Sequence, residues 1–207
     1  MATVEPVVIS AAVEGLVDEA VVRRLIQEVG GVAGPVYGKN GKPALRTKIA
    51  GYNHAANYSP WIVMVDLNHE ASCVPSLRAA WLPTPAPQMC FRVAVRAVEA
   101  WLLADHERIS RFISVDTNIL RGDPELLPDP KQRMVELAKR SNSISIRRAM
   151  VPRPESGRSV GPAYASRLIE FVTDLKDGWR PNVAAKRSES LDRCLGCLRR
   201  LMTRRSP

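Results

Sequence analysis

The chain has 207 residues, of which 45% are hydrophobic and 25% are charged, and its formal net charge at pH 7 is +9. This composition excludes collagen-like, coiled-coil and disordered proteins, and the length suffices for one α/β core with a small appended helical unit but not for two large domains. No apolar run reaches the roughly 18–20 residues of a membrane span, and the N-terminal residues do not resemble a secretory signal. We therefore expect a cytoplasmic protein without a membrane partner.

The first 58 residues alternate between patterns typical of strands and of helices. Residues 6–15 (PVVISAAVEG) predict a strand and a tight turn, and residues 18–30 (DEAVVRRLIQEVG) have the apolar spacing of a helix. The Gly- and Lys-rich residues 30–43 read as a connection, and residues 44–58 (ALRTKIAGYNHAANY) are compatible with a weak strand, a loop and a second helix. This order is typical of a βαβ unit.

The same alternation continues to residue 113. Residues 61–68 (WIVMVDLN) are an almost unbroken apolar strand, as in a parallel sheet that is covered on both faces, and residues 73–82 (CVPSLRAAWL) predict a short helix. Residues 89–96 (MCFRVAVR) alternate as a strand should, and residues 97–113 (AVEAWLLADHERISRFI) have the length of one long helix. We therefore expect an α/β fold of Rossmann-like type over residues 1–121, with a mainly parallel sheet of about four strands flanked by helices.

From residue 122 onward the pattern changes to helices alone. A Pro-rich connection (GDPELLPDPKQ) leads to helical patterns at residues 130–140, 161–176 and 190–205, without a further convincing strand. Residues 1–130 contain 12 Lys and Arg against 14 Asp and Glu, a net charge of −2, whereas residues 131–207 contain 18 against 7, a net charge of +11. Residues 122–207 therefore predict a basic helical extension packed on the core.

The basic extension favours a polyanionic partner. A concentrated positive field attracts phosphates, so nucleic acid is a better candidate than a membrane. A basic face that only keeps the protein soluble, or one that docks an acidic protein, explains the charge equally well. Charge alone leaves these alternatives open.

The cysteines and tryptophans indicate packing rather than chemistry. Cys194 and Cys197 form a C-x-x-C pair on one face of a helical pattern among leucines, which predicts a buried helix face. Zinc would need two further ligands, and Cys73, Cys90 and the three histidines supply no second recognisable pair. Trp101 and Trp179 are expected in the core, because closely interleaved aromatic and basic residues are missing.

Acidic residues follow three of the predicted strands. Glu14 follows the first, Asp66 ends the strand at residues 61–66, and Glu99 begins the helix after the strand at residues 89–96. Because the carboxyl ends of parallel strands meet at one edge, where ligands bind, we expect these side chains to gather there. Such a cluster performs acid/base chemistry or holds a hard cation such as Mg²⁺. The alternative is that Asp66 and Glu99 only cap helices.

The motif Glu14-Gly15-x-x-Asp18, followed by a strand that ends Asp66-x-Asn68, resembles the TOPRIM superfamily of topoisomerases, primases and overcoming-lysogenization-defect nucleases. Over nearly the whole chain, the segments VEGLVDEAVVRRLI, VDLNHEASC, VRAVEAWLLAD, LPDPKQ, GPAYASRL and SESLDRCLGCLRRL are similar to one bacterial TOPRIM-like family of unknown function. The resemblance implies a TOPRIM-like core and a nuclease that hydrolyses phosphodiesters with Mg²⁺ or Mn²⁺.

The resemblance also implies roles for individual residues. Glu14 would act as a general acid or base, or as a ligand, and Asp18 and Asp66 would hold the metal. Asn68 stands where the superfamily usually has a second aspartate, and its neutral amide can coordinate but adds no charge. Glu70 or Glu99 could compensate, so Asp18, Asp66, Asn68 and Glu99 are the candidate metal ligands. His69 could relay a proton, although a solvent-facing loop histidine is the simpler interpretation.

The resemblance further implies a separately encoded ATPase of the ABC or structural-maintenance (SMC) type as a partner, a role in defence against phage, and a possible homo-oligomer. No tyrosine lies in a recognisable strand-passage domain, so hydrolysis fits better than strand rejoining. The alternative is a catalytically degenerate TOPRIM module that binds nucleic acid or the ATPase as a scaffold, an interpretation that Asn68 favours. A purely structural acid cluster is a third interpretation.

Two groups of basic residues are candidates for binding nucleic acid. Lys39, Lys42 and Arg46 belong to a stretch that lacks the Gly-x4-Gly-Lys-Ser/Thr spacing of a Walker A loop, so we expect contacts to substrate phosphates rather than ATP binding. A solvated loop explains them equally well. The second group surrounds the Pro-rich residues 151–162, which could follow a phosphate backbone or seat a partner protein. Its members are Arg147, Arg148, Arg153 and Arg158.

Overall fold

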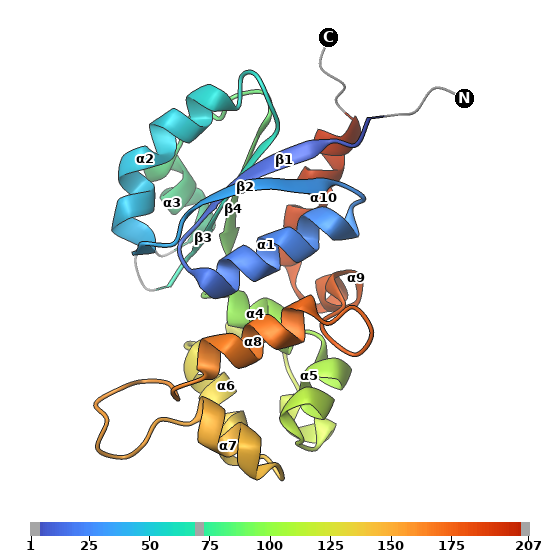
Figure 1. Ribbon diagram of the computed structural model, residues 1–207. Helices are drawn as coiled ribbons and strands as arrows, with labels where there is room; N and C mark the ends of the chain where they lie inside the picture. Colours follow the sequence, from blue (N-terminus) through green and yellow to red (C-terminus); the bar gives the residue numbers. More distant parts are fainter. Residues whose placement is uncertain (1–4, 69–72, 204–207) are drawn as a thin grey trace.

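The computed structural model describes residues 5–68 and 73–203, and these residues form an α/β fold built on one parallel sheet (Figure 1). Its strands are β1 (Val8–Val13), β2 (Val32–Gly38), β3 (Trp61–Asp66) and β4 (Met89–Ala94). They pair in the order β2-β1-β3-β4, and every pairing is parallel. The predicted fold class is confirmed: a four-stranded parallel sheet is flanked by helices.

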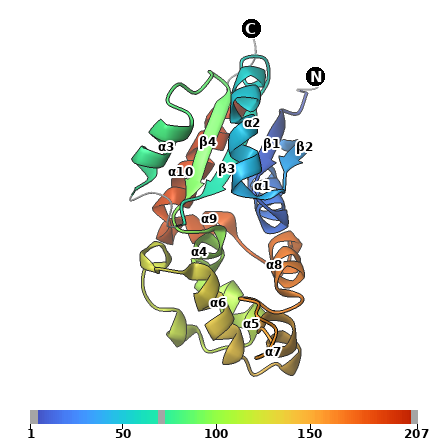
Figure 2. The same ribbon diagram turned by 90° about the vertical axis from the view of Figure 1, so that its left-hand side faces the viewer.

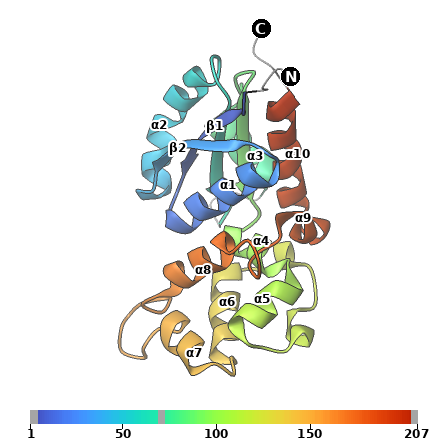
Figure 3. The ribbon, with the colours of Figure 1, turned by 45° about the vertical axis from the view of Figure 1, so that its right-hand side comes forward.

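Helices cover both faces of the sheet. On one face, α1 (Leu16–Glu28) and the C-terminal α10 (Glu189–Thr203) pack on a core that includes Ile9, Ile62 and Cys90. On the other face, α2 (Gly41–Ala55) and α3 (Val74–Trp81) pack on the alternate strand residues, such as Val63 and Phe91. Figure 3 shows α10 running beside the sheet. Because both faces are covered, β3 and β4 are buried along nearly their whole length.

The remaining helices form a layer beneath the carboxyl ends of the strands (Figures 1 and 2). They are α4 (Val98–Leu103), α5 (His106–Ile113), α6 (Pro130–Lys139), α7 (Ile144–Met150), α8 (Tyr164–Thr173) and α9 (Pro181–Ala184), joined in places by short 3₁₀ turns. One core cluster runs continuously from the sheet through α1 and α10 into α4, α6 and α8. The boundary between residues 121 and 122 stays a prediction, because no break in this core marks it.

A buried acid and two tryptophans hold this lower layer together, and one of the tryptophans connects it to α10. Asp105 is fully buried, and the Arg180 guanidinium donates to both its oxygens, at 2.9 Å to Oδ2 and 2.7 Å to Oδ1. The indole of Trp179 donates to the Trp101 carbonyl (3.2 Å), and the indole of Trp101 donates to Ser190 at the start of α10 (2.7 Å). Trp101 and Trp179 are 0% and 1% exposed, which confirms their predicted place in the core.

Three local expectations were wrong. The second strand lies at residues 32–38, inside the stretch read as a connection, and residues 41–55 are helical throughout. The sequence pattern did not predict β2 because this edge strand is partly exposed and contains Pro35. Pro35 lies where the pairing with β1 is irregular, and there its missing N–H is tolerated. The helix expected over residues 97–113 is divided, because the Asp105 side chain accepts from Arg108 N and caps α5. The strand expected over residues 89–96 is confirmed as β4, which is buried on both faces.

The structure gives the C-x-x-C pair a neighbour that sequence spacing did not. Cys194 and Cys197 are buried, as predicted for a helix face, and Cys90 of β4 lies against them. Burial raises the pKa of the Cys90 and Cys194 thiols, whereas a hydrogen bond from Cys90 and the nearby Arg92 guanidinium lower the pKa of Cys197 to about 6. In the described part of the chain these thiols belong to no group arranged to hold a metal.

Gly38, at the end of β2, provides a test of the sheet edge. Its φ is +88°, and a Cβ there would lie 2.2 Å from the Val13 carbonyl oxygen, which accepts a hydrogen bond from Lys39 N. Gly38→Ala is therefore expected to lower the free energy of unfolding by about 2–4 kcal/mol. Gly51→Ala, in the open interior of α2, should instead raise it by roughly 0.5–1 kcal/mol. Urea denaturation of both variants measures the difference, and equal stabilities would contradict the assigned backbone.

Candidate functional site: an acid-lined cavity

The sheet order brings the ends of β1 and β3 together. The chain leaves β1 toward β2 on one side and returns to β3 on the other, so β1 and β3 flank the switch point where open α/β sheets bind ligands. Glu14 directly follows β1, and Asp66 ends β3. The Asp66 backbone N–H donates to Glu14 Oε1 at 2.8 Å, which fixes the orientation of that carboxylate.

Two more acids reach the same place from helix starts. Asp18 lies in the first turn of α1, and its side chain folds back so closely that a Cβ on Gly15 would lie 3.0 Å from Asp18 Oδ2. Glu99 lies in the first turn of α4. Asp18 and Glu99 are 8% and 5% exposed, and the Asp66 carboxylate accepts from Val98 N at 3.0 Å. The sequence motif thus places four carboxyl groups around one hollow.

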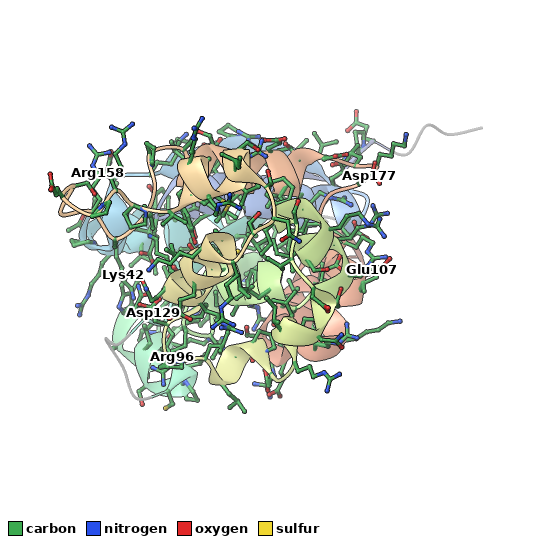
Figure 4. All side chains as sticks on the ribbon, turned by 90° about the horizontal axis from the view of Figure 1, so that it is seen from below. Lys42, Arg96, Glu107, Asp129, Arg158 and Asp177 are labelled. Carbon is green, nitrogen blue, oxygen red and sulfur yellow. The ribbon has the colours of Figure 1, made fainter. Side chains whose placement is uncertain are left out.

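That hollow, which we call the acid cavity, has a volume of about 730 Å³. Its floor is the sheet edge with Glu14, Asp18, Asp66, Asn68 and Glu99, and its other wall comes from the lower helical layer. Lys131 of α6, Arg158 of the loop before α8 and Tyr164 of α8 line this wall, and Arg96 of the loop after β4 lines the cavity from the sheet edge. Figure 4 views the molecule from this side, with Arg96, Asp129, Arg158 and Lys42 labelled.

Burial raises the pKa values of three of these carboxyl groups, and for Asp18 and Asp66 the neighbouring acids add to the effect. Burial, followed by the charges of Glu14 and Glu99, raises the pKa of Asp18 to about 7. Burial and the charges of Asp18, Glu99 and Glu14 raise the pKa of Asp66 well above its usual range. Burial also raises the pKa of Glu99, while Lys131 and a hydrogen bond from the Tyr164 hydroxyl (3.1 Å) act against it. The cavity therefore gathers more acidic groups than its cations offset, and some of these acids keep a proton at pH values at which carboxyl groups are usually ionised.

The carboxylate oxygens of the acid cavity are of the chemical type that binds a divalent cation. Asp18 Oδ1 is buried and has no hydrogen-bond partner in the described residues, and carboxylate oxygens are the ligands that Mg²⁺ prefers. In the arrangement described, however, no three His, Cys, Asp or Glu side chains of residues 5–68 and 73–203 already converge as a metal-holding group. Glu14 and Asp66 instead point an oxygen at a backbone N–H. Each of them would hold an ion through its other oxygen or after a rotation of the side chain.

The predicted basic residues do not gather in one place. Lys42 donates to the Asp66 carbonyl and Arg158 lines the acid cavity, so both lie beside the acids. Lys39 instead pairs with Glu19 (3.0 Å), and Arg46 lies over the Trp81 ring at 5.7 Å. The other three predicted arginines line a separate surface hollow on α7 and the following loop. They are Arg147, Arg148 and Arg153.

Three residues of the cavity wall were not expected from the sequence. Lys131 and Tyr164 come from the helical layer, and only the three-dimensional arrangement brings them to the acids. Arg96 has a positive φ of 62°, and Asn68 has one of 49°. Such backbone conformations are often found in functional loops, but a sequence does not reveal them. His69 and Glu70 lie outside the described residues.

Comparison of the chain with protein-family models, with curated proteins and with solved structures finds no match. The resemblance to the TOPRIM superfamily therefore stays a prediction based on the motifs. Among the described residues, no helix combines the length and apolar character that crossing a membrane requires.

Proposed function

We propose that the protein hydrolyses phosphodiester bonds in nucleic acid with the help of Mg²⁺ or Mn²⁺ bound in the acid cavity. The observation that carries the proposal is the set of four carboxyl groups at the switch point, with Asp18 held at a pKa of about 7 by burial and by its acidic neighbours. Side chains with strongly shifted pKa values in a cavity are candidates for function. The resemblance to TOPRIM nucleases points to the same chemistry.

The described residues suggest a division of work. Asp18, Asp66 and Glu99, with the Asn68 amide as a neutral donor, would hold the cation, which when bound polarises a phosphoryl oxygen and offsets its charge. Glu14, oriented by the Asp66 N–H, would accept a proton from water or return one to the leaving oxygen. Lys131, Arg96 and Arg158 face these acids and would bind the nonbridging phosphate oxygens.

The proposal extends to partners. A nucleic-acid backbone that leaves the acid cavity past Arg158 would continue along the hollow with Arg147, Arg148 and Arg153, where phosphate contacts require charge more than fixed geometry. A separately encoded ABC- or SMC-type ATPase, a role in phage defence, a cytoplasmic setting and a homo-oligomer rest on the sequence considerations given above.

A scaffold without catalysis is the second candidate function. Its specific support is that Glu14 and Asp66 accept backbone hydrogen bonds and that the described residues contain no preformed metal-holding group. Asn68 adds to it by lowering the charge of the cluster. A scaffold would use the basic hollow on α7 to bind nucleic acid or the ATPase and would leave phosphodiesters intact.

One experiment separates the two candidates. Purified protein is titrated with Mn²⁺, followed by loss of the free-ion spin-resonance signal, and is then incubated with labelled single-stranded DNA, duplex DNA and RNA, with Mg²⁺, Mn²⁺ or EDTA. The nuclease proposal expects bound Mn²⁺ and cleavage that EDTA abolishes. Nucleic-acid binding without Mn²⁺ binding or cleavage would replace it by the scaffold.

A further inference from the structure

A second cavity, of about 340 Å³, opens beside the edge strand β4. Figure 2 shows this edge between α3 and α10. Arginines from each of these elements line it: Arg78 from α3, Arg92 from β4 and Arg193 from α10, together with Arg96 from the loop after β4. We call it the arginine cavity. Because Arg96 lines the acid cavity as well, the two cavities are neighbours.

The acids of the arginine cavity are already engaged. Glu125 Oε1 accepts from the Ser190 N–H (3.0 Å) and the Ser190 hydroxyl (2.6 Å). Glu189 pairs with Arg193, four residues further along α10. The two carboxylates offset the charge of only two of the four lining guanidinium groups, so the cavity keeps an excess of positive charge.

Arg78 and Arg92 differ from other arginines with a similar burial. Five arginines have a buried Nε without a hydrogen-bond partner in the described residues. Three of them, Arg24, Arg108 and Arg167, form an ion pair with a carboxylate through another nitrogen. Within the described ranges no carboxylate pairs with Arg78 or Arg92, and Arg92 reaches only the thiols of Cys90 and Cys197 on its inner side. Both guanidinium groups without a carboxylate partner therefore line the same cavity, and Arg92 has only the acidic Cys197 thiol beside it.

The rest of the wall is apolar. Leu67, Val74, Phe91 and Val93 line the cavity together with the charged groups. A cavity of this volume falls within the roughly 300–1,000 Å³ typical of small-molecule sites. The matching ligand combines an anionic group with a flat apolar ring, which is the chemistry of one nucleoside phosphate.

The loop between the two cavities is fixed at Arg96 and Asn68. The Asn68 N–H donates to the Arg96 carbonyl at 2.8 Å, and Arg96 Nη1 donates to the Asn68 carbonyl at 3.1 Å. Both residues have left-handed backbones, a conformation that costs energy in residues other than glycine and is found at functional sites. Arg96 is thus held where one guanidinium can contact phosphates in either cavity.

We propose that the arginine cavity binds a single nucleoside monophosphate unit, with its phosphate on Arg78, Arg92 and Arg96 and its base against the apolar wall. The unit is either a free mononucleotide or the nucleotide that adjoins the scissile bond of a strand in the acid cavity. The second source rests on the proposed function, whereas binding of the unit itself does not.

The test is calorimetric titration of the whole chain in EDTA with AMP, adenosine and inorganic phosphate. EDTA removes divalent cations, so the result is independent of hydrolysis. AMP is expected to bind at least about tenfold more tightly than either fragment. Arg78→Ala should weaken AMP binding by about 10–100-fold, the effect of losing one charge-assisted contact. Arg111→Ala removes the same charge from the surface of α5, outside both cavities, and should leave AMP affinity unchanged.

The outcomes distinguish the inference from the proposed function. Absence of AMP binding, phosphate binding as tight as that of AMP, or equal effects of Arg78→Ala and Arg111→Ala would overturn the nucleotide site, even if Mn²⁺ binding and cleavage were found. A short single-stranded oligonucleotide then identifies the source. If the bound nucleotide is part of a strand, Arg78→Ala lowers the affinity for the oligonucleotide. If the ligand is a free mononucleotide, the affinity for the oligonucleotide does not change. Either result supports the site.

Discussion

Asp66→Asn is expected to lower Mg²⁺-dependent cleavage by at least about 10³-fold, or about 4 kcal/mol of transition-state stabilisation, without unfolding the protein. Asparagine has the same shape, and its Oδ1 can still accept the hydrogen bond from Val98 N. It removes one of the charges that would hold the cation between β1 and β3. Initial cleavage rates at saturating Mg²⁺, with urea denaturation in parallel, measure the two effects.

Asp116→Asn is the matched control for this prediction. Asp116 caps the 3₁₀ turn at residues 117–120 by accepting from Asn118 N at 2.8 Å, and it does not line the acid cavity. Because asparagine is an equally good cap, the variant should cleave at the wild-type rate and keep its stability within about 0.5 kcal/mol. Cleavage by Asp66→Asn at the wild-type rate would remove the acid cavity from the reaction and favour a structural acid cluster.

The sequence predicted the sheet and the acid edge because both depend on local patterns. An almost unbroken apolar run marks β3, and a strand-like pattern at residues 89–96 marks β4. Glu14 and Asp66 follow from the rule that ligands gather at the carboxyl ends of parallel strands. The motif with Gly15 and Asp18 added a short-range signal, since a side chain at residue 15 would crowd the carboxylate three residues later. These features required no knowledge of contacts between distant segments.

Other features depend on contacts that are distant in sequence. Tyr164 reaches Glu99 across 65 positions, and Cys90 reaches the C-x-x-C pair across more than 100. Neither contact leaves a local pattern. Asp105, whose local cap divides the helix, is also held by Arg180, which lies 75 residues further along the chain. Such pairings are visible only in the folded molecule.

The free energy of unfolding should depend on pH, because the pKa of Asp18 is raised in the folded protein. In the unfolded chain this carboxyl ionises near its ordinary pKa of 3.8, whereas in the folded protein it keeps its proton until about pH 7. Below pH 3.8 both states are protonated and folding is not affected. Between about pH 4 and pH 7 only the unfolded state releases the proton, so the free energy of unfolding falls as the pH rises. Above pH 7 the loss is constant.

Asp18→Asn removes this cost, so in EDTA the variant should be more stable than the wild type at pH 8 by as much as about 4 kcal/mol, with the difference vanishing near pH 4. Urea denaturation of both proteins in steps from pH 4 to pH 8 measures it. A difference that does not change with pH would show that Asp18 ionises normally.

Mg²⁺ should offset the stability that the wild type loses at high pH. A cation that binds the ionised carboxylates stabilises the folded state by mass action, and it does so more strongly at pH 8, where Asp18 has lost its proton, than at pH 5. Asp18→Asn, which lacks that charge, should gain little from Mg²⁺ at either pH. An acid cluster that costs stability without a cation and regains it with one is a binding site, whereas a cluster that shows the pH dependence but ignores Mg²⁺ is only a strained part of the fold.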